Sequence, residues 1–476
     1  TGVSTYLLVF YLVRSRTAAF VGSLIFTFAP IRMSRVVFGS LNLLSTQLIP
    51  HAVLFAVQMI RTERWYYAVS AALMIGATAG ADLFLAYGTG LLVLVLVTCH
   101  ISVSIWRRNW TQLKRSVGNA SLFGLCTIVF SAPFVWPMVE SYAAFRDQVN
   151  PVQASIENSA DFLGFWLPDF PTQPLLYRHL PAFYQIIERV HGDFQGNLAE
   201  KTVFIGYMVL FLTASALITG QVRRFWPWTV VALTFLLLSI GPVMHVGGRV
   251  LLHHLPYEWL STIPLANFGR TPSRFALFLM LALAVIGGYA LAQMEAKRSQ
   301  LRWLTVLLAG VIFVEFLGVP MHVDPRFQQI PAYYYSLSSR VGEEQAAVLD
   351  IPIDLVGAQG PAAEYMLYQT VHQRPIVSGY ISRTPLSVLW IYDSPFLMEL
   401  RARIYGNTAP FQIDDAMMAR ATEDLHLLQV GIVVLHRWAL SPQDANTLRQ
   451  TFTSLLADPQ YEDSQITVWR VRTAEP

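Results

Sequence analysis

The chain has 476 residues, of which 54% are apolar and only 13% are charged, and its formal net charge is +3. A soluble domain carries about 25% charged residues, so this composition, with a mean hydropathy of +0.44, argues against an ordinary soluble protein. The two cysteines, Cys99 and Cys126, lie inside apolar segments and are expected to be buried thiols.

Charge divides the chain into two parts. Residues 1–321 hold 22 Lys and Arg against 13 Asp and Glu, whereas residues 322–476 hold 11 Arg, no Lys and 17 Asp and Glu. We therefore expect a basic membrane domain at 1–321 and an acidic soluble domain at 322–476. The basic excess lies mostly at the ends of apolar segments, which favours contact with membrane lipids rather than nucleic acid.

Apolar stretches in the first part predict an α-helical polytopic membrane protein. Their continuous apolar runs favour helices over the alternating strands of a barrel. In chain order, the ten expected spans are 1–13, 17–31, 42–60, 66–81, 86–106, 117–139, 202–219, 225–242, 274–293 and 303–320.

Basic residues concentrate in every second loop between these spans. Thirteen lie in five short loops: Arg14, Arg16, Arg61, Arg64, Arg107, Arg108, Lys114, Arg115, Arg223, Arg224, Lys297, Arg298 and Arg302. The loops between them carry only seven: Arg32, Arg35, Arg146, Arg178, Arg189, Arg249 and Arg270. Positive loops face the cytoplasm in polytopic proteins, so this alternation predicts the side on which each loop lies.

The expected topology is a multi-pass protein of the plasma (inner) membrane. Loops 32–41, 82–85, 140–201 and 243–273 then face outward, and the domain at 322–476 is extracytoplasmic. Since the first span runs inward, one more span is expected before Thr1, giving about eleven in an N-terminally longer protein. Loop 140–201 is rich in aromatic residues and proline, and either lines a groove at the membrane surface or forms a packed cap.

The tail 322–476 is expected to fold as a small α/β domain. Strands are predicted at 348–353, 374–377, 430–435 and 465–471, and helices at 338–347, 358–371, 412–427 and 441–456.

Carboxylates at expected helix ends are the first candidates for chemistry. Asp82 could bind a metal or a substrate hydroxyl, or be a solvated acid at a helix boundary. Glu315 falls inside the last span, where a charged group is costly and suggests either function or an internal hydrogen bond. Glu200, just before a span, could touch a substrate or favour the helix dipole.

The outer segment 241–275 is the richest in polar residues. It contains His245 and Arg249, and then Arg270 and Arg274, four apart, where a new helix starts. Arginine side chains and a helix N-terminus both bind phosphate well. Thr271 or Ser273 could cap that helix, with Pro272 in its first turn. Ordinary anchoring to lipid headgroups is the alternative. His253 and His254 are poor metal ligands, because adjacent side chains point in different directions.

Several loose patterns resemble bacterial polytopic glycosyltransferases of the GT-C superfamily with an external C-terminal domain. They span most of the chain and lie at residues 41–47, 200–207, 241–248, 271–275, 368–372 and 379–380.

The resemblance implies transfer of a sugar from a polyprenyl-phosphate donor to an extracytoplasmic acceptor, with inversion. In that family an acid of the first external loop acts as base or holds a divalent metal such as Mg²⁺ or Mn²⁺. That acid would lie upstream of Thr1, which leaves Asp82 as a weak candidate. Arg270 and Arg274 match the family's late-loop arginines in role. Non-catalytic envelope assembly on the same scaffold is the alternative, and a transporter is less favoured because no repeated half is visible.

Overall fold

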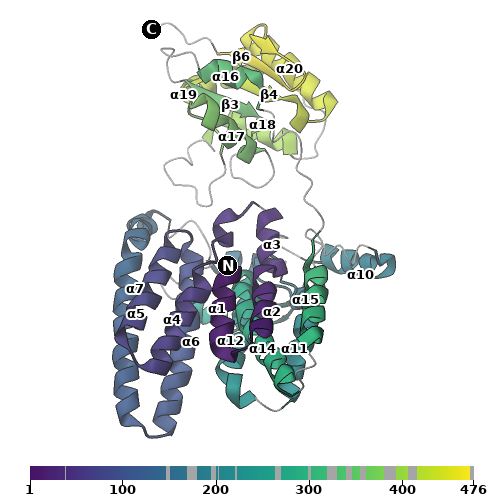
Figure 1. Ribbon diagram of the computed structural model, residues 1–476. Coiled ribbons are helices and arrows are strands. Elements are labelled where there is room, and N and C mark those ends of the chain that lie inside the picture. Colours follow the sequence, from purple (N-terminus) through teal and green to yellow (C-terminus); the bar gives the residue numbers. More distant parts are fainter. Residues whose placement is uncertain are drawn as a thin grey trace. The chain divides into compact units, whose positions relative to one another are not determined.

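The computed structural model describes residues 1–37, 39–145, 151–168, 179–194, 200–201, 203–219, 222–262, 270–297, 302–318, 330–338, 346–353, 361–379, 393–405 and 415–471. Contacts divide the chain into two compact units, Thr1–Met321 and His322–Pro476 (Figure 1). Each unit is described by itself.

The first unit is built from helices in two packed groups. One group contains α4 (Ile49–Thr62), α5 (Trp65–Ala79), α6 (Leu83–Trp106) and α7 (Trp110–Phe145). The other contains α1 (Gly2–Val13), α2 (Arg16–Thr27), α11 (Tyr207–Ile218), α12 (Val222–Ile240), α14 (Ala276–Lys297) and α15 (Arg302–Phe316), as Figure 1 shows. Contacts of α1 with α4 and of α6 with α12 join the groups.

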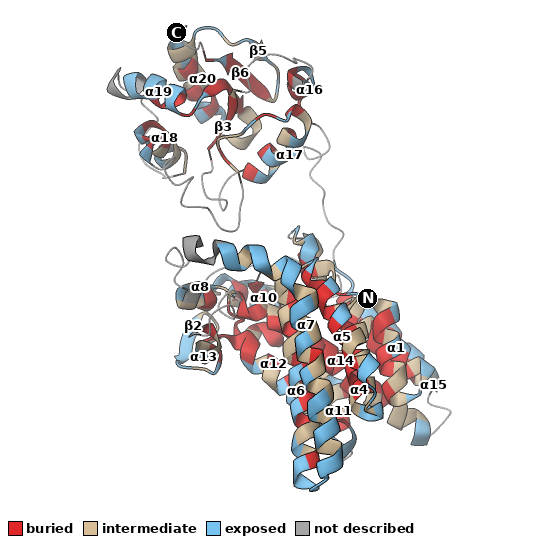
Figure 2. Cartoon of the chain, turned by 90° about the vertical axis from the view of Figure 1, so that its left-hand side faces the viewer, coloured by how far each residue is buried: buried red, intermediate tan, exposed pale blue. Residues whose placement is uncertain are grey.

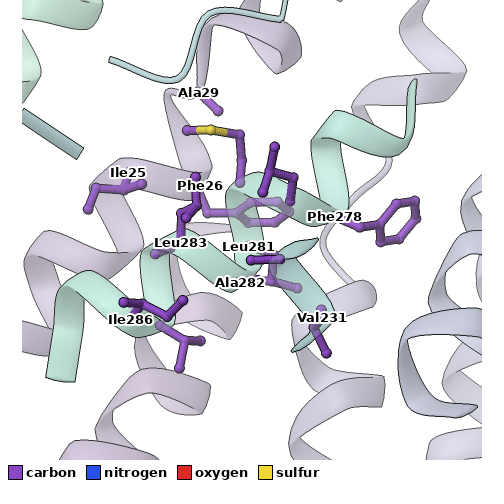
Figure 3. Packing of buried hydrophobic residues seen from close by; sticks show 14 of the residues in the cluster. Ile25, Phe26, Ala29, Val231, Phe278, Leu281, Ala282, Leu283 and Ile286 are labelled. Atoms are coloured by element: carbon purple, nitrogen blue, oxygen red, sulfur yellow. The ribbon is translucent and has the colours of Figure 1, made fainter. Parts of the chain in front are cut away.

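Helix α14 is the centre of this unit. It packs against α1, α2, α11 and α12, and its candidate span is 89% buried. Figure 3 shows side chains of α2, such as Phe26, beside Leu281 and Leu283 of α14. The backbones of α2 and α14 approach closely at Gly22, where an added Cβ would lie 3.0 Å from the Ala284 carbonyl oxygen. Small residues at such crossings are typical of helices packed in membranes.

Among the described residues, fewer helices are long enough to cross a membrane than the sequence predicts. Each of the ten expected spans contains a helix, but only Leu83–Trp106, Trp110–Glu140 and Pro272–Lys297 are individually long and apolar enough. A fourth span results if the bent pair Arg16–Thr27 and Pro30–Val36 counts as one. The count of about ten spans is therefore not supported. A helix of 12–15 residues rises only about 18–23 Å, less than the roughly 30 Å of a hydrocarbon core.

Helix α7 differs from α14 in its exposure. Only 6% of its candidate span is buried, and Figure 2 shows it as the exposed outer helix in front of the buried α14. Leu125 and Ile128 on α7 are 61% and 70% exposed. Such a row of exposed apolar side chains is the surface that contact with lipid would cover, so the structure is consistent with membrane insertion.

The long segment 140–201 is partly structured. Helix α7 continues to Phe145, and α8 (Pro151–Glu157), the 3₁₀ turn η2 (Phe162–Phe165) and α10 (Pro181–Gly192) follow. Phe165 is buried against the core of the first unit, so this part of the segment is packed rather than groove-forming. The aromatic stretch 169–178 lies outside the described residues.

The polar segment after α12 forms a β-hairpin. Strand β1 (Met244–Val246) pairs with β2 (Arg249–Leu252), and α13 (Tyr257–Thr262) follows. The 3₁₀ turn η5 (Pro272–Phe275) then leads directly into α14.

The second unit contains a four-stranded sheet in the order β3-β4-β6-β5. Strand β3 (Ala347–Ile351) is parallel to β4 (Val430–His436), β6 (Ile466–Arg470) is antiparallel to β4, and β5 (Tyr461–Glu462) pairs with β6. Its helices are α16 (Ala332–Ser338), α17 (Ala362–His372), α18 (Pro395–Tyr405), α19 (Asp415–Leu427) and α20 (Pro442–Leu456).

Most predicted elements of this unit are present, with three differences. The stretch 374–377 contributes only an isolated bridge from Ile376 to Val348, not a strand. Of the helix expected at 338–347, Ser338 is the last residue of α16 and Ala347 is the first residue of β3. Residues 339–345 between them lie outside the described residues. Helix α18 and strand β5 were not predicted.

A buried polar cluster lies where the parallel strands end. The Tyr334 hydroxyl donates to Asp350 Oδ1 at 2.8 Å, and His436 Nε2 lies 2.9 Å from the same oxygen. All three side chains are at most 1% exposed. The rings of Tyr365 and Tyr368 stack on His436, which closes the cluster against solvent.

Candidate functional site

Glu200 is the centre of a buried ion cluster in the helical unit. Arg35 Nη2 donates to Glu200 Oε2 at 2.9 Å, and Arg274 donates to Oε1 through Nε at 3.0 Å and Nη2 at 2.6 Å. The Ser273 hydroxyl donates to Oε2 at 2.9 Å. One carboxylate thus holds two guanidinium groups from distant parts of the sequence.

Local structure places each member of this cluster. Arg35 lies near the end of the short helix α3 (Pro30–Val37), which follows the bend after α2. Ser273 and Arg274 lie in η5, where Pro272 occupies the first turn as predicted. Thr271 precedes that turn without making a side-chain cap, and Ser273 turns to Glu200 instead. The expected capping role of these two residues is therefore not found.

The charges of the cluster are strongly coupled. Burial by itself would raise the pKa of Glu200, but the nearby charges of Arg35 and Arg274 outweigh it and lower the pKa to about 2. The side chains of Glu200 and Arg35 are 2% and 4% exposed, whereas that of Arg274 is 27% exposed. Glu200 is therefore ionised at neutral pH, and Arg274 retains an accessible side.

Beside this cluster lies a narrow pocket with three arginines in its wall. It encloses about 240 Å³ when its open mouth is counted, but the cavity itself is only about 10 Å³, far below the roughly 300–1,000 Å³ of a drug-sized ligand site. Its lining residues are Ile31, Arg32, Arg35, Leu43, Leu85, Arg274 and Leu277. A cavity of this size has room for about one water-sized group, and its wall combines three cations with apolar side chains.

Arg32 is the cation of this pocket that lacks an acidic partner among the described residues. Its Nε donates to the Thr46 hydroxyl at 2.9 Å and its Nη1 to the Thr27 carbonyl at 2.7 Å. These partners hold the side chain in place without neutralising it. With Glu200 cancelling one of three positive charges, the pocket has a net charge of about +2.

Asp82 bonds to residues that line the pocket or lie next to its lining in the sequence. It is the N-cap of α6, accepting a hydrogen bond from the Leu85 amide at 2.9 Å, and Leu85 lines the pocket. Asn42 donates to its other oxygen at 2.6 Å and is followed by the lining residue Leu43. Because both partners are neutral amides, Asp82 keeps its negative charge uncancelled.

A second buried network contains Asp161, which is not among the predicted site residues. Its carboxylate accepts hydrogen bonds from the amides of Gly247 at 3.1 Å and Gly248 at 2.8 Å. Both glycines have positive φ, 59° and 74°, as a two-residue hairpin turn between β1 and β2 requires. The backbone amides of Gly247 and Gly248 therefore bind the buried carboxylate of Asp161.

Lys201 is electrostatically coupled to the carboxylates of both networks. It is only 2% exposed, and its Nζ donates to the Ser159 carbonyl at 2.6 Å. Burial lowers the pKa of Lys201 to about 8, although Asp161 and Glu200 act in the opposite direction. Burial and the charge of Lys201 also lower the pKa of His245. His245 is a buried residue of β1 whose backbone forms an isolated β-bridge with Asp161.

The other predicted site residues lie apart from this pocket's lining. Glu315 is 3% exposed and accepts hydrogen bonds from the amides of Tyr207 at 2.5 Å and Met208 at 3.1 Å. It therefore caps the N-terminus of α11, which gives the internal hydrogen bond expected as one alternative. Arg249 is exposed on the hairpin, and Arg270 is half-buried just before η5.

Of the predicted residues, Glu200 and Arg274 bond to each other. Arg32 and Arg35 complete the site but are not among the predicted site residues, and Ser273, predicted as a helix cap, donates to Glu200 instead. One signal could have indicated Arg32 and Arg35. They lie three residues apart on the short helix α3, inside the expected outward loop 32–41, which should be poor in basic residues.

Neither a scan of protein-family models nor a search of curated protein sequences found a match for this chain. Within the described ranges, no three His, Cys, Asp or Glu side chains form a group that could hold a metal ion. The expected Mg²⁺ or Mn²⁺ therefore stays a prediction.

Proposed function

We propose that this chain is a membrane glycosyltransferase that binds a polyprenyl-phosphate sugar and transfers the sugar to an extracytoplasmic acceptor. The observation that carries the proposal is the pocket lined by Arg32, Arg35 and Arg274, of which only Arg35 and Arg274 share the Glu200 carboxylate. Guanidinium groups bind phosphate oxygens through paired, charge-assisted hydrogen bonds. The apolar wall of the same pocket suits a lipid.

The position of the pocket supports a lipid-linked donor. It lies at the start of Pro272–Lys297, one of the candidate membrane spans, and Leu277 of that span lines it. The phosphate would contact the arginines while the polyprenyl chain follows the helices into the membrane. The proposed site faces the extracytoplasmic side, together with residues 322–476.

In the proposed reaction an acceptor hydroxyl attacks the anomeric carbon of the donor sugar. A carbon–oxygen bond forms there while the bond to the phosphate oxygen breaks, so the configuration inverts. Asp82 takes the hydroxyl proton, and the polyprenyl phosphate leaves with the negative charge that Arg32 and Arg274 stabilise. A divalent metal at the acid is compatible with this scheme.

The test uses the full-length protein with a polyprenyl-phosphate sugar labelled in the sugar. Arg32→Gln should weaken donor binding by about 10- to 100-fold, because a hydrogen bond to a charged group contributes about 1.5–3 kcal/mol. Arg249→Gln, at an exposed hairpin position, is the matched control and should retain wild-type binding. Equal binding by wild type and Arg32→Gln would contradict the phosphate site.

Non-catalytic envelope assembly on the same scaffold is the alternative, favoured by the fact that the Glu200 cluster is complete without any ligand. Donor binding that depends on Arg32, without transfer of the label to any acceptor in membranes, would support this alternative.

A further inference from the structure

A second, larger pocket lies at the opposite end of helix α14. It encloses about 1050 Å³, counting its open mouth. The 22 residues of α14 rise about 33 Å, so this pocket and the Glu200 cluster are separated by about one membrane thickness. Its lining residues are Leu12, Val13, Arg61, Arg224, Tyr289, Ala292, Gln293, Ala296 and Lys297.

Three helix ends each contribute one cation to this pocket. Arg61 comes from the last turn of α4, Arg224 from the first turn of α12, and Lys297 from the last residue of α14. Arg61 lies over the ring of Tyr11, 5.3 Å from its centroid, with Arg14 at 5.2 Å from the same ring. The Tyr11 ring therefore holds two arginines near each other without neutralising their charges.

The acidic residues near these helix ends have other partners. Glu63 forms an ion pair with Arg115 at 3.1 Å. Glu295, near the end of α14, accepts hydrogen bonds from the hydroxyls of Ser15 and Thr17. Because no described acidic residue lines the pocket, its wall has a formal charge of +3.

Two further features of the lining point to a ligand. Gln293 Oε1 accepts a hydrogen bond from Thr219, but its Nε2 is buried without a partner in the described part of the chain. Leu12, Val13 and Ala292 supply an apolar wall next to the cations. A hydrogen-bond donor, three positive charges and an apolar wall together suit a phosphate ester attached to a hydrocarbon chain.

We propose that this pocket binds the headgroup phosphate of an anionic phospholipid of the surrounding membrane. The site does not depend on the proposed glycosyl transfer. Basic pockets between membrane helices recognise anionic headgroups in this way, and each Lys or Arg near the membrane surface contributes about 1 kcal/mol. A water-soluble phosphate compound shares the anion but would leave the apolar wall unused.

The experiment measures lipid binding to the full-length detergent-solubilised protein by native mass spectrometry. The probes are phosphatidylglycerol, phosphatidylcholine and sn-glycerol 3-phosphate. The variant Arg224→Gln/Lys297→Gln removes two exposed cations and leaves the Arg61–Tyr11 contact intact. The matched control Arg107→Gln/Lys114→Gln also loses one Arg and one Lys, at exposed positions outside the pocket lining.

Wild type and control should bind phosphatidylglycerol at least about tenfold more tightly than phosphatidylcholine. The pocket variant should lose about 30-fold in affinity for phosphatidylglycerol, which corresponds to two cations at roughly 1 kcal/mol each. An equal loss in the control would show a diffuse surface effect and overturn the pocket. Tight binding of glycerol phosphate alone would assign the site to a soluble ligand and overturn the lipid assignment. Matching thermal unfolding of both variants and wild type shows that the loss is local.

Discussion

Glu200 in the helical unit and Asp350 in the C-terminal unit are both buried carboxylates, but their partners differ in kind. Glu200 is held by two arginines beside an open pocket, whereas Asp350 is held by Tyr334 and His436 inside a closed aromatic cluster. Asp350 is only 1% exposed, and the rings of Tyr365 and Tyr368 stack on its partner His436. A buried acid therefore marks a candidate site only where excess charge and open space accompany it.

The largest effect is expected from removing Glu200. The variant Glu200→Ala leaves Arg35 and Arg274 buried or half-buried without a counter-charge, and loss of one partner of a buried ion pair costs about 3–5 kcal/mol. The measurement is the free energy of unfolding in detergent micelles. Glu63→Ala, which breaks the partly exposed pair with Arg115, is the control and should cost at most about 1 kcal/mol.

Low pH should reduce the difference in the free energy of unfolding between wild type and Glu200→Ala. The pKa of Glu200 is about 2 in the folded protein and 4.5 as its ordinary value, so its stabilising contribution is complete above pH 4.5 and is lost as the pH falls toward 2. Wild type and Glu200→Ala should therefore converge over this range. A constant difference between pH 5 and pH 2.5 would contradict the charge pairing described for Glu200.

Asp350→Ala should have a smaller effect, about 1–3 kcal/mol, the cost of unsatisfied buried polar groups. The loss is limited because Tyr334 and His436 lie 3.2 Å apart and can hydrogen-bond to each other without Asp350. Hydrogen exchange of the β3 and β4 amides in the full chain measures this loss of stability. A loss as large as that of Glu200→Ala would remove the distinction between the two clusters.

The sequence predicts the helices well but not their lengths. All ten apolar stretches contain a helix, because long apolar runs are stable only when buried in protein or lipid. Helix ends depend on caps and turns, however. The stretch expected at 202–219 begins its helix only at Tyr207, after Gly206, whose φ of 95° and close approach to Phe316 no other residue would tolerate well.

The site was only partly predictable, because its members are distant in the sequence. Arg35 and Glu200 are 165 residues apart, and Glu200 and Arg274 are 74 apart, so no local pattern joins them. What could be predicted was local: Arg274 at a helix start, and carboxylates at helix ends. Charge bias indicated that Arg32 and Arg35 were unusual in their loop, without indicating their partner.

The smallest effect on stability, and the sharpest one on function, is expected at Asp82. Asparagine caps helices about as well as aspartate, so Asp82→Asn should keep the cap on Leu85 and change the free energy of unfolding by less than about 0.5 kcal/mol. It removes the charge that would accept a proton, so sugar transfer should fall by about 10²- to 10⁴-fold while donor binding is retained. Transfer assays and donor binding on the same preparation separate these outcomes. Full transfer activity in Asp82→Asn would leave Asp82 with only the capping role, making it, like Asp350, a carboxylate whose role is structural.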